Sequence, residues 1–209
     1  MPRVSRKQAD LNREIIVEAA TRLFRERGLH GISVVDVMAA AGLTHGGFYG
    51  HFESREALAR EASERAFKEV GAKWRERITG EDKAQARRAL IEPYLSIESR
   101  DNPGESCPVV AFAGDMCHEP TDSSLREPFM AGLNRLLEAF GKLMDSDDAA
   151  QNRQQALVQY SLMVGALTLA RATRGDALSK RILEEAQTCL TEPAAPFCNF
   201  GSIKKNRRL

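Results

Sequence analysis

Residues 33–52 read SVVDVMAAAGLTHGGFYGHF and decide the fold of the N-terminal part of the chain. Ser33 can cap a short helix, and Asp36, three residues later, supplies the acidic partner of a capping-box arrangement. Gly42 interrupts this helix, and Thr44 can cap a second short helix. Two short helices joined by a glycine-containing turn predict a helix-turn-helix unit.

Longer amphipathic helices are predicted on both sides of this unit. Between residues 10 and 27 apolar side chains recur with a helical period, and this helix would brace the short pair. Ser54 opens another long helix, which holds Glu56 in its positive first turn. Further helices are predicted at about residues 83–99, 107–118, 124–144, 148–174 and 176–190. Because no sustained period-2 pattern occurs, the sequence predicts an all-α fold of about nine helices.

Composition and hydropathy exclude several classes of protein. Apolar residues make up 43% and charged residues 28% of the 209 residues, which excludes a disordered chain and allows a packed core. The longest apolar runs hold five residues, whereas a membrane span needs about 18, and no export leader is expected. Four cysteines without a CxxC pair are expected to be reduced thiols of a cytoplasmic protein, namely Cys107, Cys117, Cys189 and Cys198.

The net charge of +1 conceals two basic ends on an acidic body. Residues 1–7 carry three basic and no acidic side chains, and residues 204–209 carry four and none. Such asymmetry is typical of proteins that contact a polyanion, and it also occurs in solvated tails. Because Arg3, Arg6 and Lys7 precede a helix-turn-helix unit, we expect them to form a basic arm that reaches DNA. The C-terminal cluster lacks such a context and is expected to be a solvated tail.

The second short helix begins with residues suited to reading DNA. In a helix-turn-helix the second helix lies in the major groove, and its N-terminal residues face base edges. Thr44 and His45 can donate hydrogen bonds there, and Gly46 and Gly47 allow close approach of the backbone. Glycines destabilise a helix interior by about 1 kcal/mol each, so this pair suggests a purpose other than helix stability. A packed helical hairpin without a ligand is the alternative.

The remainder of the segment divides into buried and phosphate-facing residues. Phe48 and Phe52 are four residues apart and should pack inward. Tyr49 and His51 then point elsewhere and can hold phosphate oxygens. Arg55 lies at the positive N-terminus of the next helix and adds a further anion contact.

Several short motifs lie between residues 10 and 60, namely Arg22-Leu23-Phe24, Glu26-Arg27-Gly28, Ser33-Val34, Asp36-Val37, Ala41-Gly42-Leu43, Gly46, Phe48-Tyr49, His51-Phe52 and Ser54-Arg55-Glu56-Ala57-Leu58. These motifs resemble those of the tetracycline-repressor-like (TetR/AcrR) transcriptional regulators. The resemblance implies a three-helix DNA-binding domain joined to a larger helical domain that binds a ligand and dimerises. We therefore predict a DNA-binding domain at 1–54, a ligand-binding and dimerisation domain at 55–192 and a flexible basic tail at 193–209.

The resemblance also assigns contacts to individual residues. It implies phosphate contacts from Ser33, Tyr49, His51 and Arg55, and base or groove contacts from Thr44, His45 and Gly47. The sequence departs from the usual family pattern where His45 replaces a lysine, Gly47 a small hydroxyl or alanine, and Gly50 a bulky residue. The predicted DNA-contacting set is Arg6, Lys7, Ser33, Val34, Thr44, His45, Gly46, Gly47, Tyr49, His51 and Arg55.

Specific recognition by a helix-turn-helix requires two copies on half-sites related by two-fold symmetry. Stripes of small and medium residues on the last two helices predict the interface of a homodimer, against the alternative of an ordinary monomer core. These residues are Leu157, Ser161, Val164, Gly165, Thr168, Ala172, Leu178, Ile182 and Ala186. Large adaptable side chains on the middle helices predict an apolar inducer pocket, although such residues are more often plain core. They are Trp74, Tyr94, Cys107, Phe112, Met116, Phe140 and Met163.

Cysteine chemistry supplies two alternatives to a ligand-released repressor. Cys107 precedes Pro108 at the predicted start of a helix, where the helix dipole favours the thiolate, so a repressor that senses oxidants or electrophiles is one alternative to a small buried hydrophobe. A remote alternative is a Cys/His enzyme or metal site built from Cys107, Asp115, Cys117 and His118. Cys117 and His118 are adjacent and diverge on a helix, and phosphate-loop, HExxH and GxSxG motifs are absent from the sequence.

Together these features predict a homodimeric transcriptional regulator without a cofactor or metal and without enzymatic activity. Its expected partners are a palindromic double-stranded DNA operator and a small-molecule inducer that lowers operator affinity.

Overall fold

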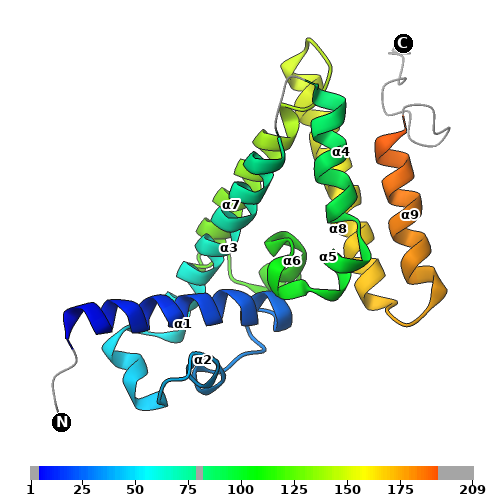
Figure 1. The fold of residues 1–209 in the computed structure, drawn as a ribbon. Helices are drawn as coiled ribbons and strands as arrows, with labels where there is room; N and C mark the ends of the chain where they lie inside the picture. Colours follow the sequence, from blue (N-terminus) through cyan, green and yellow to red (C-terminus); the bar gives the residue numbers. More distant parts are fainter. Residues whose placement is uncertain (1–4, 79–81, 193–209) are drawn as a thin grey trace. The chain divides into compact units, whose positions relative to one another are not determined.

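The computed structural model describes residues 5–78 and 82–192, and within these ranges all regular secondary structure is helical (Figure 1). Nine α-helices and two 3₁₀ helices follow one another there: α1 (Arg6–Arg27), α2 (Val34–Ala40), η1 (His45–Gly50), α3 (Arg55–Arg77), α4 (Lys83–Tyr94), α5 (Ile97–Asp101), η2 (Pro103–Glu105), α6 (Pro108–His118), α7 (Arg126–Gly141), α8 (Ala149–Ala172) and α9 (Ala177–Thr191). The predicted all-α fold is confirmed.

The described residues form two compact units. The first contains residues 5–75 and 101–136, and the second contains residues 76–78, 82–100 and 137–192. This division does not follow the predicted boundary after residue 54, because most of α3 packs with the N-terminal helices. The division into a DNA-binding and a ligand-binding domain stays a functional prediction. The predicted basic tail at 193–209, with Cys198, and Arg3 lie outside the described residues.

Helix α1 begins earlier than residue 10 because Ser5 caps it. The backbone N–H of Gln8 donates to Ser5 Oγ at 3.2 Å, which satisfies one of the free N–H groups of the first turn. Arg6 and Lys7 are therefore exposed residues of a helical turn and not of an extended arm. At the other end Gly28, with a φ of 79°, leads the chain out of the helix.

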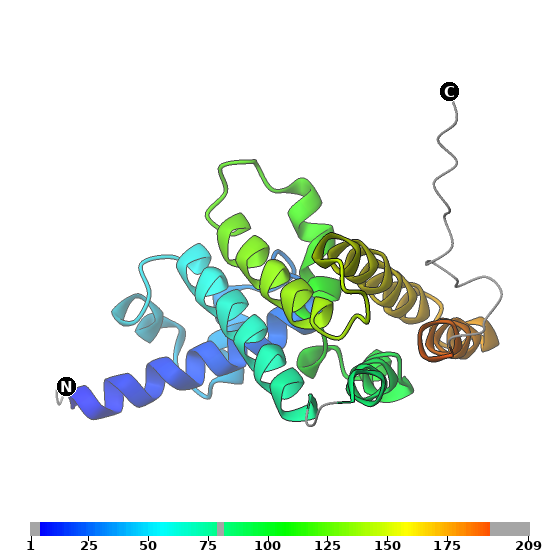
Figure 2. The same ribbon diagram turned by 90° about the horizontal axis from the view of Figure 1, so that it is seen from above.

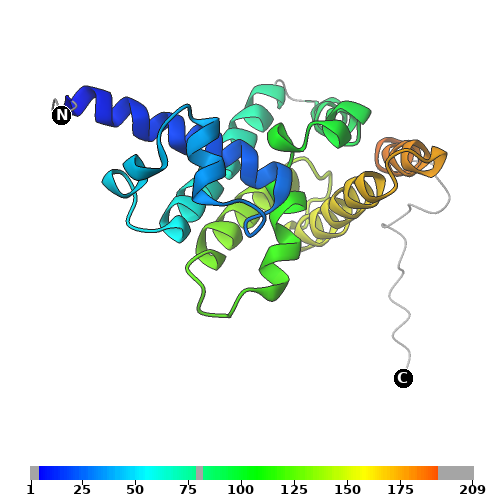
Figure 3. The same cartoon turned by 90° about the horizontal axis from the view of Figure 1, so that it is seen from below.

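The capping box predicted for α2 is present. Asp36 N–H donates to Ser33 Oγ at 3.2 Å, and Ser33 N–H donates to Asp36 Oδ2 at 2.9 Å. Hydrogen bonds from the Ser33 hydroxyl and backbone lower the pKa of Asp36, so the carboxylate is favoured. Helix α2 and the turn η1 pack against each other, and α2 packs on α1 (Figure 3).

The first unit is completed by α3, α6 and the first part of α7. Helices α3 and α7 run side by side (Figure 2) and approach closely at Gly132, where an added Cβ would overlap the ring of Phe67. Phe67 is itself buried and meets Phe129 edge-on at 5.9 Å between ring centroids. Helix α6 contacts α1, and its Asp115 accepts a hydrogen bond of 2.6 Å from the N–H of Leu29, which follows α1.

In the second unit α8 and α9 pack along each other, and α4 contacts both. The predicted single helix 83–99 is wrong, because the chain leaves helical geometry at Leu95 with φ −94° and ψ 39°. Ser96 then starts α5, since its Oγ accepts from Ser99 N–H at 3.0 Å. Cys107 and Cys117 are free thiols, whereas Cys189 is disulfide-bonded, so the expectation of reduced cysteines is wrong for Cys189. Within the described ranges, no helix has the length and apolar character needed to cross a membrane.

Gly132→Ala tests the close approach of α3 and α7. The new methyl group has no space beside the buried Phe67 ring, so we expect a loss of about 1–3 kcal/mol in unfolding free energy from overpacking. The matched control is Gly114→Ala in α6, where an added Cβ meets no atom within 4 Å. This control should be neutral or slightly stabilising in urea titrations. Equal stability of the two variants would contradict the packing described.

Candidate nucleic-acid interface

The turn η1 separates buried from exposed aromatic residues as the sequence predicts. Phe48 is 0% exposed and stacks on the buried Phe52 with ring centroids 5.6 Å apart. Tyr49 touches the edge of Phe48 at 5.2 Å yet is 70% exposed, so its hydroxyl is available to solvent. The inward packing of Phe48 and Phe52 is thus confirmed, and Tyr49 projects from a rigid base.

The glycines of η1 are not required by the fold. Gly46, Gly47 and Gly50 all lack the left-handed backbone conformation that favours glycine. A Cβ at Gly46 or Gly50 would meet no atom within 4 Å, and one at Gly47 would make ordinary contact with Met38 at 3.8 Å. Neither conformation nor internal packing explains the glycines, and they leave the backbone of η1 accessible from outside.

Arg13 fixes the base of this turn from the side of α1. Its guanidinium lies 4.7 Å above the centroid of the Phe52 ring. The same group donates two hydrogen bonds, of 2.6 and 2.5 Å, to the carboxylate of Glu61 in α3. Hydrogen bonding to Glu61 raises the pKa of Arg13. Sequence reasoning missed Arg13, since only the fold brings α1, η1 and α3 together around it.

Arg55 has a supporting role that sequence reasoning also missed. Its Nε donates to the carbonyl of Ile32 at 2.8 Å, and its Nη2 donates to the carbonyl of Leu29. The guanidinium lies 5.6 Å from the centroid of the buried Phe24 ring. Arg55 therefore holds the segment between α1 and α2, and two of its nitrogens are engaged in these hydrogen bonds.

The other predicted contact residues differ in exposure. Thr44 and His45, at the start of η1, are exposed, whereas Val34 and His51 are partly buried. Ser33 is exposed, but its hydroxyl donates to Asp36 Oδ2 at 2.5 Å, so only its remaining lone pair faces outward. The structure thus leaves Thr44, His45 and Tyr49 with the most accessible side chains around η1.

The predicted inducer-pocket residues are all buried, but in two different units. Four lie in the first unit and three in the second: Trp74, Cys107, Phe112 and Met116, and then Tyr94, Phe140 and Met163. In the second unit Tyr160, which the sequence did not single out, lies 6.3 Å from Tyr94 and 6.4 Å from Phe140 between ring centroids. Their role in ligand binding stays a prediction.

The predicted dimer residues of the second unit lie on α8 and α9. Five of them are exposed and three are partly exposed, whereas Ala186 is buried within the chain; the exposed ones are Leu157, Ser161, Thr168, Ala172 and Leu178. A groove of about 440 Å³ runs between the two helices, lined in part by Gly165 and Ile182. The groove also contains Leu169, which is 56% exposed and which the sequence stripe did not include.

The geometry gives little support to the cysteine-based sensor or to the Cys/His enzyme or metal site. Cys107 is the N-cap residue of α6 and is buried, and burial shields a thiol from solutes. Cys117 is exposed near the end of the same helix. In the part of the chain that the structure describes, no group of three or more metal-ligating side chains comes together.

The N-terminal segment of the chain matches a known protein family. Residues 16–62 match the family model of the bacterial regulatory proteins, tetR family. Over 58 residues the chain is 41% identical to the HTH-type transcriptional repressor DhaR of Mycobacterium sp. (strain GP1). These aligned residues make up 28% of this chain and 29% of that protein. The match therefore spans less than a third of this curated relative.

Solved structures extend the similarity to most of the chain. A TetR transcriptional regulator from Chloroflexus aurantiacus superposes with a TM-score of 0.73 and 27% identity, covering 90% of this chain and 96% of that one. The reduced form of NemR from E. coli superposes with a TM-score of 0.71 and 21% identity, covering 86% of this chain and 94% of that one. The resemblance to TetR/AcrR regulators is confirmed, and the matched family is one of regulatory proteins.

Arg55→Ala tests the support of the segment between α1 and α2. Loss of the guanidinium leaves the carbonyls of Leu29 and Ile32 without their donor, so we expect unfolding free energy to fall by about 1–3 kcal/mol. Arg60→Ala, an exposed position of the same helix, is the control and should change it by less than about 0.5 kcal/mol. If Arg55→Ala is as stable as wild type, these hydrogen bonds do not support the turn.

Proposed function

We propose that this chain is a member of the TetR family of bacterial regulators and a homodimeric repressor of transcription. It binds a palindromic double-stranded DNA operator, and a small-molecule inducer releases it. The observation that supports DNA binding best is the surface of η1, where an accessible glycine backbone and an exposed Tyr49 rest on the buried Phe48–Phe52 stack. Because its partner is DNA, we place the protein in the cytoplasm.

The roles of the η1 residues follow from their exposure. Thr44 and His45 lie at the N-terminal end of the turn and face base edges in the major groove. Tyr49 donates its hydroxyl to a phosphate, which anchors the turn without reading sequence. Gly46 and Gly47 admit the DNA close to the backbone. Arg6 and Lys7, exposed in the first turn of α1, add sequence-independent attraction to phosphates.

Selection of bound fragments from random duplex DNA tests this function. We expect an inverted repeat whose half-sites lie about one helical turn apart, as two-fold symmetry requires. The same selection with His45→Ala should return a different preferred base within each half-site. Recovery of no preferred sequence by the wild-type protein would overturn the proposed function.

Gly46→Ala isolates the close approach of the backbone to DNA. The methyl group meets no atom of the protein within 4 Å, so the thermal midpoint should be unchanged or slightly higher. On DNA it occupies the space between backbone and bases, and we expect at least about tenfold weaker binding to the selected operator. Gly114→Ala, which also has open space around the new methyl group, is the control and should bind like wild type. Undiminished binding by Gly46→Ala would exclude close approach at this position.

The dimer interface is proposed on the exposed faces of α8 and α9. Leu169 is 56% and Leu178 50% exposed, and the small residues Ser161 and Gly165, which line the groove with Leu169, permit close helix approach. Two helices from each copy then bury these faces in a four-helix arrangement related by two-fold symmetry. Burial of the leucines supplies the driving force.

Leu169→Glu tests this interface. A carboxylate at the groove cannot be buried without a partner, so we expect a monomer in light-scattering measurements where the wild type is a dimer. Met130→Glu is the matched control, because Met130 is a 48% exposed apolar residue of the first unit. A dimer that persists in Leu169→Glu but dissociates in Met130→Glu would place the interface elsewhere.

A further inference from the structure

Arg13 of α1 joins two parts of the first unit that are far apart in the sequence. Its guanidinium donates two hydrogen bonds, of 2.6 and 2.5 Å, to the two carboxylate oxygens of Glu61 in α3. It also lies 4.7 Å from the centroid of the Phe52 ring, two residues beyond the end of η1. A two-pronged pair with a carboxylate holds the planar guanidinium in one orientation, so the ring meets a fixed cation.

Ring contacts continue from Phe52 to the exposed Tyr49. Phe52 is 5% exposed and stacks on Phe48, with ring centroids 5.6 Å apart and planes 25° apart. Phe48 meets the Tyr49 ring edge-on, at 5.2 Å and 85°. Because aromatic pairs favour particular orientations, a change in the tilt of Phe52 alters the positions of the next two rings. A continuous path of contacts therefore leads from Glu61 to a side chain on the outer surface of η1.

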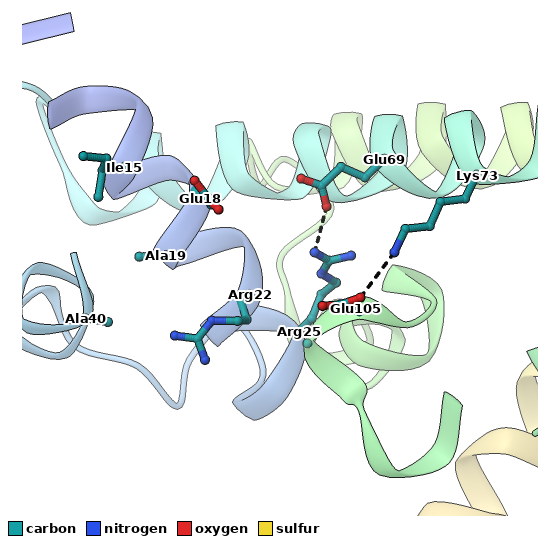
Figure 4. A pocket seen from close by; sticks show the side chains of 10 residues that line it. Ile15, Glu18, Ala19, Arg22, Arg25, Ala40, Glu69, Lys73 and Glu105 are labelled. Atoms are coloured by element: carbon teal, nitrogen blue, oxygen red, sulfur yellow. Dashed lines mark hydrogen bonds and ion pairs between the residues drawn. The ribbon is translucent and has the colours of Figure 1, made fainter. Parts of the chain in front are cut away.

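Two other ion pairs between α1 and α3 have no such connection. Arg65 of α3 donates to Glu14 of α1, and Arg25 of α1 donates to Glu69 of α3 at 2.8 Å (Figure 4). Neither of these two guanidinium groups lies over an aromatic ring of the described residues, whereas that of Arg13 does. The contact with the ring therefore distinguishes Arg13 from the other cations between the same two helices.

Partial exposure limits what the Arg13–Glu61 pair adds to stability. The Arg13 side chain is 43% exposed and that of Glu61 is 35% exposed. Ion pairs that water reaches contribute little to the free energy of unfolding, because solvent screens their attraction. The pair does fix a geometry, since both prongs of the guanidinium are used. Its contribution is thus to orientation more than to stability.

We propose that Arg13 is a positioning residue for DNA recognition. Held by Glu61, it fixes the tilt of Phe52 and, through Phe48, the direction of the Tyr49 hydroxyl. A hydrogen bond to a phosphate weakens steeply when its distance or angle departs from the favoured range, so a displaced Tyr49 loses this contact. The phosphate contact of Tyr49 rests on the proposed function, whereas the placement of its ring by Arg13 does not.

Arg13→Met tests the placement of Tyr49 in the full chain without DNA. Methionine is flexible and can still cover Phe52, but it has neither the charge nor the two-pronged hydrogen bond. In two-dimensional NMR spectra we expect the ring signals of Tyr49, two rings away from the substitution, to shift. The matched control is Glu14→Gln, which removes the ion pair with Arg65 between the same helices and should leave these signals in place. Unmoved Tyr49 signals in Arg13→Met would overturn the proposal.

Two gentler variants keep this test independent of folding. Glu61→Gln retains one acceptor for Arg13 but loses the second carboxylate oxygen, and should shift the Tyr49 signals in the same direction by less. Arg13→Lys retains the charge without the planar fork, and should restore only part of the wild-type positions. Wild-type Tyr49 signals in both variants would overturn the role of the two-pronged pair.

A double-mutant cycle on the selected operator tests the consequence for DNA. Tyr49→Phe removes only the hydroxyl, and we expect about tenfold weaker operator binding in the wild-type background. In the Arg13→Met background the hydroxyl is already misplaced, so the same change should cost less than about threefold. In the Glu14→Gln background it should again cost about tenfold. A purely structural role of Arg13 would lower the thermal midpoint without changing the cost of Tyr49→Phe.

The outcomes of the cycle separate this proposal from the proposed function. An equal loss from Tyr49→Phe in the wild-type and Arg13→Met backgrounds, or no loss in either, would overturn the positioning role of Arg13 while operator binding stands. If the wild-type protein selects no operator, the proposed function fails and the DNA role of Arg13 fails with it. The Tyr49 ring signals of the free protein then still decide whether Arg13 places this side chain.

Discussion

The backbone of Leu29, where the chain leaves α1, is fixed on both sides, and the helix-turn-helix depends on this constraint. Its N–H donates to Asp115 of α6 at 2.6 Å, and its carbonyl accepts from Arg55 of α3. The preceding Gly28 adopts a φ of 79°, and a Cβ there would lie 3.0 Å from Asp115 Oδ2. A glycine, a carboxylate and a guanidinium from three separate segments therefore set the direction in which the chain enters α2.

The turn η1 is rich in glycine, and packing beneath it holds its backbone in place. Three of the six residues of η1 are glycines, which by themselves favour an unfolded backbone. The turn is ordered by what lies beneath it, because Phe48 and Phe52 are buried as a stacked pair and Arg13 covers Phe52 while bound to Glu61. Because these buried contacts hold η1, its outer surface needs no packed side chains and can consist of glycines. A surface of this kind lets a partner molecule approach the backbone closely.

Local patterns in the sequence predict the helices, but they do not predict polar contacts between residues far apart in the sequence. Ser33 and Asp36 are three residues apart, so their capping box can be read from spacing alone, and the same is true of the buried Phe48 beside the exposed Tyr49. Arg55 looks like a free cation at a helix start, and its carbonyl partners are more than twenty residues away in sequence. Arg25 likewise resembles an exposed cation of a last helical turn until the fold buries it.

The small number of accessible side chains on η1 constrains how the protein can achieve specificity. Phe48 is buried and the glycines have no side chain, so the proposed recognition of DNA assigns a phosphate contact to Tyr49 and base contacts to Thr44 and His45. A good base contact discriminates by about 1–3 kcal/mol, whereas specific sites are favoured over random DNA by about 4–10 kcal/mol. Under the proposed function one copy of η1 falls short of this free energy, and a second half-site, together with the deformability of the DNA between the half-sites, would supply the remainder. The exposed apolar faces of α8 and α9, where the dimer is proposed, would join the two copies, so the proposed reading surface and the proposed dimer depend on each other.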